Sequence, residues 1–516
     1  MISEKPSAED GGREAAGEEA PYSTFSLWQK RWTIFLAALT GMFSPMSSFI
    51  FYPAIHSIAE SLRVTVVLIN LAITTYMVVS GVVPALLGNA ADKFGRRPVY
   101  LFALSIYSAA NIGLGLQNTY AGLLVLRGIQ SAGSSGVLFI STSSLSPPLR
   151  QQCTLGTISL GYGVLSDITT RAERGSYVGV LLLGPNVAPP VGPILGGVLA
   201  AKLGWKWIFW MLCILGGACL LLVLVALPET SRVIVGNGSK PARGIYETLI
   251  SALKKRLKGH DKTETDVVFD HKSRAKFTLP NPLACLRLLL LWDVAVVLLC
   301  NGIYYTIACT IQASLSTLFI EVYNYQSLEA GLIYIPFGVA SLAGAFSWGK
   351  VLDYDFARLA RQAGLSTDEV RQQGNTIDFP IENARLRSAL ILVVLNTIGT
   401  VGYGWFIHFR VHVSVPVILQ TVVGFATSAM FVALGTLLTD LNPNRASTAS
   451  ASANIVRCAL AATALAVLQP IIDRVGVGWC FTIFGLLGAL CGPFMVWGIQ
   501  RGAGLRRKRQ AAEESG

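Results

Sequence analysis

Two arginines are the only charged side chains that lie well inside the long apolar segments of this chain. Arg127 and Arg457 are each roughly eight or nine residues into their segments, which is near mid-membrane if these segments cross a bilayer. Ionisable groups at that depth are costly and mark substrate or ion pathways. A guanidinium carries a fork of N–H donors that fits a carboxylate. No carboxylate accompanies the two arginines, so the pattern predicts a site for an organic anion.

The alternative is that both arginines only hold helices together, through backbone carbonyls and, for Arg127, through Gln130. Uncharged polar side chains in the same segments would complete a cavity, although such groups more often bond a neighbouring helix. The candidates are Asn301, Tyr304, Tyr305, Gln312, Asn396, Gln420 and Asn454. We assign the two arginines to the substrate site together with Gln130, Asn301, Tyr305 and Asn454.

The composition is that of a membrane protein. Of 516 residues, 52% are hydrophobic and 14% are charged, whereas soluble proteins carry about 25% charged residues. A water-facing surface cannot be built from so few charges. This excludes a soluble enzyme, a disordered scaffold and a conventional nucleic-acid binder. The 41 lysines and arginines exceed the 29 acids, as expected for basic loops beside anionic lipid.

Twelve segments are long and apolar enough to span a bilayer as helices. They cover residues 32–54, 64–88, 98–116, 119–140, 175–200 and 205–227, and then 293–319, 327–349, 387–407, 415–438, 447–470 and 477–499. We therefore expect an all-α membrane protein with a disordered tail (1–30), a six-helix half (31–230), a central loop (231–292), a second six-helix half (293–500) and a C-terminal tail (501–516).

Lysine and arginine gather in the loops of one side, which predicts the orientation. The central loop carries twelve of them between Arg232 and Arg287, and the chain ends in the basic run 506–509. Both termini and the central loop are therefore expected in the cytoplasm. Basic clusters on that face favour the plasma membrane, whose inner leaflet is anionic.

The two halves repeat one spacing. Gly88 and Asp92 follow the second helix of the first half, and Gly349 and Asp353 follow the second helix of the other half. Internal repeats of this kind mark secondary transporters, whose substrate site lies between the halves near the bilayer midplane.

With this repeat, the chain resembles the major facilitator superfamily over nearly its whole length. The signature loop of that family is matched by Gly88, Asp92, Gly95, Arg96 and Arg97. Gly349 and Asp353 repeat part of this motif in the second half. The resemblance implies a charge cluster on the cytoplasmic face that locks the outward-facing state and is broken as the halves rock.

Two further motifs resemble drug:proton antiporters. Arg127 and Gln130 stand in a fourth-helix motif (LRGIQSAG), and a fifth-helix antiporter motif (VGPILGG) contains Gly192, Pro193, Gly196 and Gly197. The latter implies an exporter, although Ala188 and Pro189–Pro190 depart from the pattern upstream of it. The runs FSPMSSFIFYPAI, LPETSR and DFPIENARLR are most similar to the fungal branch of citrate exporters and quinidine-resistance proteins.

These patterns predict a secondary transporter that exports an organic anion, such as a citrate-like di- or tricarboxylate or an acidic secondary metabolite, by alternating access. The same fold would also serve a broad multidrug:proton antiporter or, more remotely, a non-transporting sensor. No enzyme motif, metal-ligand spacing or cofactor motif occurs in the segments, so no catalytic residue, metal or cofactor is expected. Proton coupling and a monomeric state are implied by the resemblance alone.

Residues 137–156 (VLFISTSSLSPPLRQQCTLG) interrupt the fourth segment and match nothing in the family. Joining Gly136 to Thr157 gives a continuous fourth helix. The insert has 20 residues, hence 60 nucleotides, and its first valine codon supplies the GT of an intron donor. We hypothesise a retained intron or a gene-model error, the alternative being a genuine loop. Transcript sequencing is expected to find these codons spliced out, and dominant reads through them would contradict the hypothesis.

Overall fold

In the computed structural model, the described residues are 24–87, 95–136, 174–236, 244–251, 291–362, 380–442 and 446–514, with Val164, Ile168 and Leu253. This part of the chain is helical and contains no strand. The insert 137–156, residues 1–23 of the N-terminal tail and most of the central loop lie outside it. Gly88 and Asp92 also lie outside the described residues.

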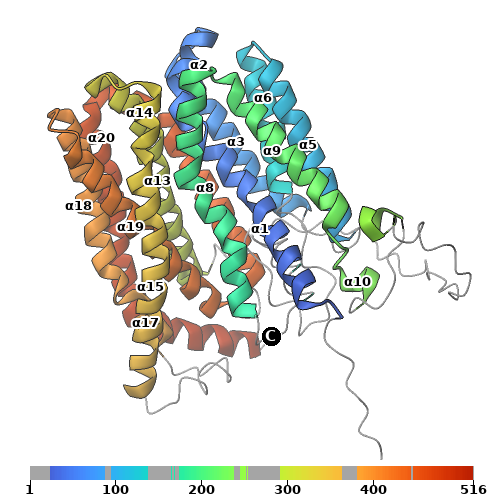
Figure 1. The fold of residues 1–516 in the computed structure, drawn as a ribbon. Helices are drawn as coiled ribbons and strands as arrows, with labels where there is room; N and C mark the ends of the chain where they lie inside the picture. The colour runs from blue at the N-terminus through green and yellow to red at the C-terminus, as the bar shows by residue number, and fades with distance from the viewer. Residues whose placement is uncertain are drawn as a thin grey trace, which may run out of the picture.

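The first half of the chain forms one helical bundle (Figure 1). Its helices are α1 (Leu27–Phe49), η1 (Tyr52–Ala54), α2 (Ile55–Leu62), α3 (Val66–Leu87), α5 (Arg96–Leu116), α6 (Tyr120–Gly136), α8 (Arg174–Lys202) and α9 (Lys206–Ala226). Two short elements, α10 (Arg232–Val235) and η3 (Gly244–Tyr246), follow it.

The second half forms a matching bundle beside the first (Figure 1). Its helices are α13 (Trp292–Tyr323), α14 (Ser327–Leu332), α15 (Tyr334–Gln362), α17 (Ile381–Leu386), α18 (Ala389–His408), α19 (Ser414–Leu441) and α20 (Ala446–Glu514). The last of these is two helices joined at Gly476, whose φ of 84° breaks the helical path.

The described helices account for twelve passes. Nine of them are long and apolar enough to cross a bilayer by themselves. The others are α6, described for 17 residues, α8, which contains the shorter apolar stretch Val187–Lys202 among its described residues, and the second arm of α20 beyond Gly476. Helices are expected here because a bilayer offers the backbone no water, so each N–H and C=O must be paired within its own segment.

Small residues set the packing between the two bundles. A Cβ added at Gly81 of α3 would lie 2.8 Å from the Cβ of Cys458 on α20, and one at Gly338 of α15 would lie 2.1 Å from the Cβ of Pro190 on α8. Such close approach is how membrane helices associate when lipid removes the hydrophobic drive. The halves therefore meet along α3 with α20 and along α8 with α14 and α15.

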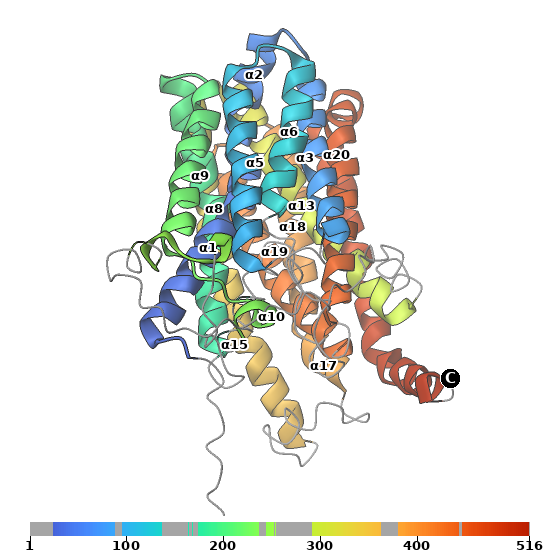
Figure 2. The same ribbon diagram turned by 90° about the vertical axis from the view of Figure 1, so that its right-hand side faces the viewer.

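Both ends of the described chain lie at the same end of the molecule (Figures 1 and 2). Helix α1 begins there and α20 finishes there in an arm that runs across the bundle (Figure 1). We name this the terminal end. Helix α2 lies at the opposite end (Figure 1).

Two glycines of α15 differ in packing, and substitutions at them test how closely α15 packs on α19. A Cβ at Gly344 would lie 2.4 Å from the carbonyl oxygen of Phe425 on α19, whereas a Cβ at Gly349 would meet nothing within 4 Å. Gly344→Ala is expected to lower the free energy of unfolding by about 1–3 kcal/mol through overpacking. Gly349→Ala is expected to leave it unchanged or raise it by up to about 1 kcal/mol. Thermal unfolding in detergent measures both, and equal effects would contradict the packing.

Candidate functional site

Arg127 lies near the middle of α6 and is fully buried. Its Nη1 donates to the carbonyl oxygen of Ser47 at 3.0 Å and to Oε1 of Gln130 at 2.8 Å. Ser47 is in the last turn of α1, where carbonyls lack an intrahelical partner and carry the negative end of the helix dipole. The break between α1 and η1 thus provides one partner for the charge.

Two aromatic rings cover the Arg127 guanidinium. Its Cζ lies 4.4 Å from the ring centroid of Phe51 and 4.6 Å from that of Tyr76. These cation–π contacts stabilise the charge but make no hydrogen bonds. The Nε and Nη2 atoms are buried and have no hydrogen-bond partner. They form one edge of the guanidinium fork, the geometry that binds a carboxylate through two N–H groups.

Gln130 orients this arginine. Its Nε2 donates to Oδ1 of Asn111 at 2.7 Å, and Nδ2 of Asn111 donates to the carbonyl oxygen of Tyr107 at 2.8 Å. The chain of bonds fixes the amide so that its oxygen faces Arg127. Gln130 therefore positions the guanidinium, as the alternative interpretation of the sequence expected. The Nε and Nη2 edge keeps no hydrogen-bond partner, and in this sense we call it the open edge.

Arg457 on α20 has a similar environment in the second half. Its Nη2 donates to Oδ1 of Asn454 at 2.7 Å. Its Cζ lies 4.7 Å from the ring centroid of Tyr305 and 5.9 Å from that of Phe431. The Nε atom is buried without a partner. The structure thus brings three predicted site residues together, namely Arg457, Asn454 and Tyr305.

Asn454 also joins the two halves. Its Nδ2 donates to the carbonyl oxygen of Ser80 on α3 at 3.2 Å. The same amide therefore contacts the second-half arginine through its oxygen and the first half through its nitrogen. A change in the contacts of Arg457 would therefore alter the hydrogen bond between the two halves.

The other uncharged candidates divide into two groups. Tyr304, Asn396 and Gln420 hydrogen-bond neighbouring helices, through the Gly488 carbonyl, Thr427 Oγ1 and the Ile333 carbonyl respectively. Asn301 and Gln312 are buried with side-chain oxygens that have no partner. Among the described contacts, no hydrogen bond joins Asn301 to either arginine.

Four aromatic residues of the site were not identified from the sequence. Phe51, Tyr76 and Phe431 contact the arginines as described, and Tyr52 follows in the break after α1. Aromatic residues are common in apolar segments, so their type gives no signal. Only the run FSPMSSFIFYPAI, singled out by resemblance, contained two of them.

The start of α5 is held by a buried carboxylate at the end of α9. Glu229 accepts the backbone N–H groups of Arg96 at 2.9 Å and Arg97 at 3.2 Å. A carboxylate at a helix N-terminus is favoured by the helix dipole. Gly95 precedes the helix with a φ of 88°, and a Cβ there would lie 2.5 Å from Oε2 of Glu229. The Arg97 guanidinium donates to carbonyls of α9 and η3.

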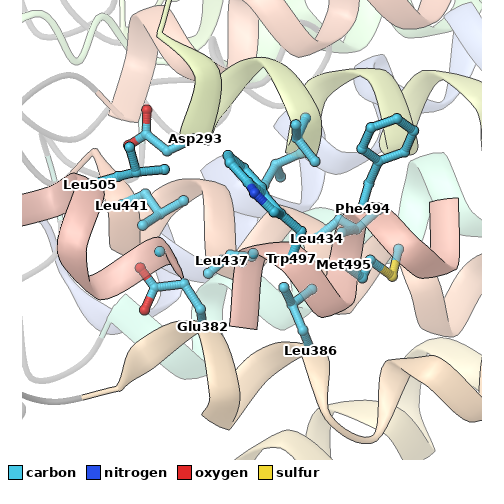
Figure 3. Close-up of a pocket in the computed structure, with 14 residues that line it drawn as sticks. Asp293, Glu382, Leu386, Leu434, Leu437, Leu441, Phe494, Met495, Trp497 and Leu505 are labelled. Atoms are coloured by element: carbon cyan, nitrogen blue, oxygen red, sulfur yellow. The ribbon is translucent and has the colours of Figure 1, made fainter. Parts of the chain in front are cut away.

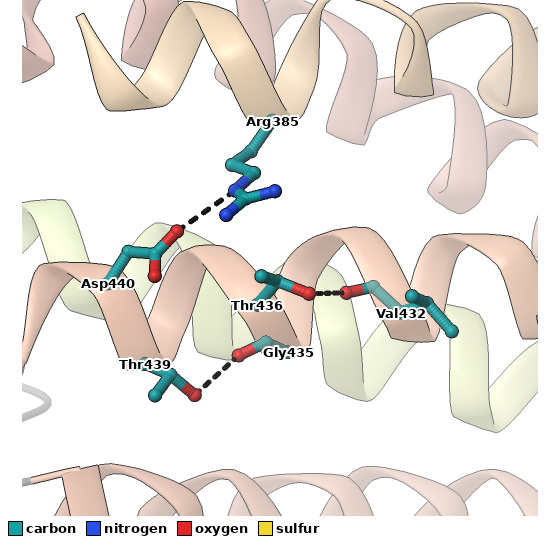
Figure 4. Close-up of polar contacts among 6 residues, drawn as sticks. All are labelled: Arg385, Val432, Gly435, Thr436, Thr439 and Asp440. Atoms are coloured by element: carbon teal, nitrogen blue, oxygen red, sulfur yellow. Dashed lines mark hydrogen bonds and ion pairs between the residues drawn. The ribbon is translucent and has the colours of Figure 1, made fainter. Parts of the chain in front are cut away.

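The second half has its own ion pairs at the terminal end. Glu382 of α17 and Arg506 of α20 are both buried, with Nε–Oε1 at 2.8 Å and a bond from Nη2 to Oε2 at 3.0 Å. Arg385 donates its Nε to Oδ2 of Asp440 on α19 at 2.9 Å (Figure 4). The predicted Asp353 is exposed on α15.

A small cavity lies beside Glu382, the acid that pairs with Arg506 (Figure 3). It is lined mainly by apolar side chains, among them Leu386, Leu437, Phe494 and Trp497, and by Glu382. Its volume of about 30 Å³ holds a water molecule. It is too small for a metabolite, so it is no substrate site.

The predicted fifth-helix motif lies between the halves on α8. A Cβ at Gly196 would lie 2.1 Å from the carbonyl oxygen of Ile50 on α1. A Cβ at Gly331 of α14 would lie 3.0 Å from the carbonyl oxygen of Pro193 and 3.1 Å from the Cα of Gly197. Gly192 also faces Ile50. The motif thus packs α8 against both halves at once.

The sequence was compared with known proteins. The model of the Major Facilitator Superfamily matches residues 37–147 and 153–465. The match therefore continues into residues 137–147 and 153–156 of the insert, and only residues 148–152 are left out of it. The MFS-type transporter phiD of Fungal sp. (strain ATCC 74256) is 37% identical over 99% of this chain and 73% of its own. Citrate exporter 1 of Aspergillus niger is 32% identical over 96% and 90%. Multidrug transporter QDR2 of Candida glabrata is 30% identical over 96% and 84%.

The fold is similar to that of solved transporters. The xylose transporter XylE from E. coli, in a partially occluded inward open conformation, superposes with a TM-score of 0.58 at 15% identity, over 91% of this chain and 97% of its own. The expectation of twelve helices in two pseudo-symmetric halves is confirmed.

The buried pair of Glu382 and Arg506 gives a test. Glu382→Leu removes the carboxylate that pairs with the buried guanidinium of Arg506 and is expected to lower the free energy of unfolding by about 3–5 kcal/mol. The double variant Glu382→Leu/Arg506→Leu is expected to recover most of that loss, because both charges are gone. Denaturant unfolding in mixed micelles measures both, and a double variant as unstable as the single one would contradict the pairing.

Proposed function

This chain belongs to the Major Facilitator Superfamily, and from that premise we propose that it exports an organic anion by alternating access. It is a multi-pass membrane transporter, and its relatives are transporters rather than enzymes. The substrate proposed is a citrate-like di- or tricarboxylate or an acidic secondary metabolite.

The open edge of Arg127 is the observation that supports this proposal. A permanent cation buried without a counter-ion costs several kcal/mol after relaxation. The Ser47 carbonyl, Gln130 and two aromatic rings offset part of that cost. The N–H groups of Nε and Nη2 still lack acceptors. A substrate carboxylate would supply two acceptors and the missing negative charge.

A second carboxylate suits Arg457. This arginine comes from the other half and also has a buried donor, Nε, without a partner. A dianion that contacts both arginines would draw the halves together around it. Binding would then favour the occluded state of the alternating-access cycle, since a ligand shifts a conformational equilibrium only by its differential affinity.

The proposal includes the direction of transport, the orientation of the chain in the membrane and the ion to which transport is coupled. The fifth-helix motif supports export, and one relative bears the name of a citrate exporter. We propose that the terminal end, with both chain termini, faces the cytoplasm and that the membrane is the plasma membrane; the basic central loop and tail support this. We propose a monomer. Protons are the expected coupling ion from the family, and no described residue identifies a carrier.

A broad multidrug exporter is the second candidate, because one relative bears that name. Its cationic substrates would use aromatic faces. Here the rings of Phe51, Tyr76 and Tyr305 already cover guanidinium groups, and a second cation beside them would be repelled. The anion is therefore favoured.

Arg127→Lys tests the proposal because it keeps the charge and removes the fork. It is expected to weaken citrate transport at least about tenfold in apparent affinity, since a hydrogen bond to a charged group is lost. Counterflow of labelled citrate into proteoliposomes measures this effect.

Arg474→Lys is the matched control, because Arg474 is exposed at the end of the first arm of α20, just before Gly476. It should transport citrate like the unaltered chain. Equal citrate transport by the Arg127 variant, or efflux of cationic dyes with no response to any carboxylate, would overturn the anion proposal.

A further inference from the structure

The first membrane-crossing segment breaks after α1, and two residues at this break contact groups in different halves. Helix α1 ends at Phe49, and Tyr52–Ala54 form a 3₁₀ turn before α2. A short 3₁₀ stretch within a span often marks a functional hinge. The Phe51 ring covers Arg127. The carbonyl oxygen of Pro53 lies 3.5 Å from Oγ of Ser316 on α13, in the other half.

Tyr52 lies between these two contacts and is fully buried. Its hydroxyl has no hydrogen-bond partner. Ser48, one turn earlier, lies beside the phenol but does not reach hydrogen-bond geometry. A buried hydroxyl without a partner costs free energy. The hydroxyl is therefore a donor that needs an acceptor.

The surroundings of Tyr52 belong to both halves. Its phenol lies within electrostatic range of Arg127 in the first half and of Cys309, Tyr334 and Tyr305 in the second. Tyr305 in turn covers Arg457. The phenol thus has neighbours in both halves, namely Arg127 itself and the tyrosine that covers Arg457.

Three other buried tyrosines of the described chain have a hydrogen-bond partner. Tyr76 donates to the Ser44 carbonyl at 2.8 Å, Tyr304 to the Gly488 carbonyl at 3.1 Å and Tyr334 to the Gln312 carbonyl at 2.6 Å. Tyr403 on α18 is like Tyr52 in being fully buried with an unpartnered hydroxyl. It packs edge-on against Phe481, in the second half.

We propose that the Tyr52 hydroxyl donates a hydrogen bond to the substrate anion whose carboxylate is held by the open Nε and Nη2 edge of Arg127. The inference rests on the proposed function. It makes the break after α1 part of the binding site, and it selects anions that carry a further acceptor beyond the carboxylate on Arg127. Through Pro53 the same turn contacts the second half, so substrate binding is linked to closure at the end opposite the termini.

Tyr52→Phe tests the proposal because it removes one oxygen and keeps the ring. The purified full-length chain is titrated with citrate in a calorimeter, and its melting temperature is measured without citrate. The variant is expected to melt at the same or a higher temperature, since an unpaired hydroxyl is gone. Its citrate dissociation constant is expected to rise about tenfold or more, because the lost bond is to a charged acceptor. Tyr403→Phe, the matched control, should bind citrate unchanged.

The remaining outcomes separate the two proposals. Citrate binding by the unaltered chain with no change in Tyr52→Phe overturns the role of Tyr52 alone. Absence of citrate binding by the unaltered chain, with binding of a cationic dye such as rhodamine 6G, overturns the proposed function and this inference with it. A Tyr52→Phe chain that does not fold, or that melts at a lower temperature, would show that the hydroxyl is bonded within the protein and would also overturn the inference.

Discussion

The charge of Arg127 in the interior of a helical bundle is the constraint on which the site depends. A guanidinium cannot lose its proton to escape burial, so every one of its N–H groups needs an acceptor. The chain provides a helix-end carbonyl, an oriented glutamine and two aromatic faces, and these partners occupy one side of the group. The carbonyl at the break in the first span and the polar chain through Asn111 both hold this side in place.

At the terminal end, buried donors also need acceptors, and carboxylates supply them. In the first half Glu229 joins the end of α9 to the start of α5 through backbone N–H groups. In the second half Glu382 and Arg506 join the start of the α17–α18 region to the end of α20. The third and sixth passes of each half are therefore tied at the same end, by different chemistry. Each half can then move as a rigid body, as alternating access requires.

The sequence predicted the fold well because its signals are strong. Long apolar segments and basic loops define helices and halves before any contact is known. It also identified both arginines, since a charge inside an apolar segment is conspicuous. It could not find Tyr52, Phe51 or Phe431, because an aromatic residue is unremarkable among apolar neighbours and only the fold shows which ring covers a guanidinium.

The predictions for uncharged residues show the same limit. Asn454 and Tyr305 lie at Arg457, whereas Asn396 and Gln420 bond neighbouring helices. Helix periodicity does not give the rotation of each helix, which packing between the halves decides. The charge pattern around Gly88 and Asp92 and the role of the insert stay predictions, because these residues lie outside the described chain.

The most direct test of the anion exporter is a profile of organic acids in the medium of a yeast host that expresses the chain without residues 137–156. Host cells expressing the same chain with Arg457→Ala serve as the control. The account predicts that a carboxylic acid accumulates outside the cells and that the variant abolishes this accumulation. Surface expression with no acid in the medium, together with increased efflux of cationic drugs, would contradict it.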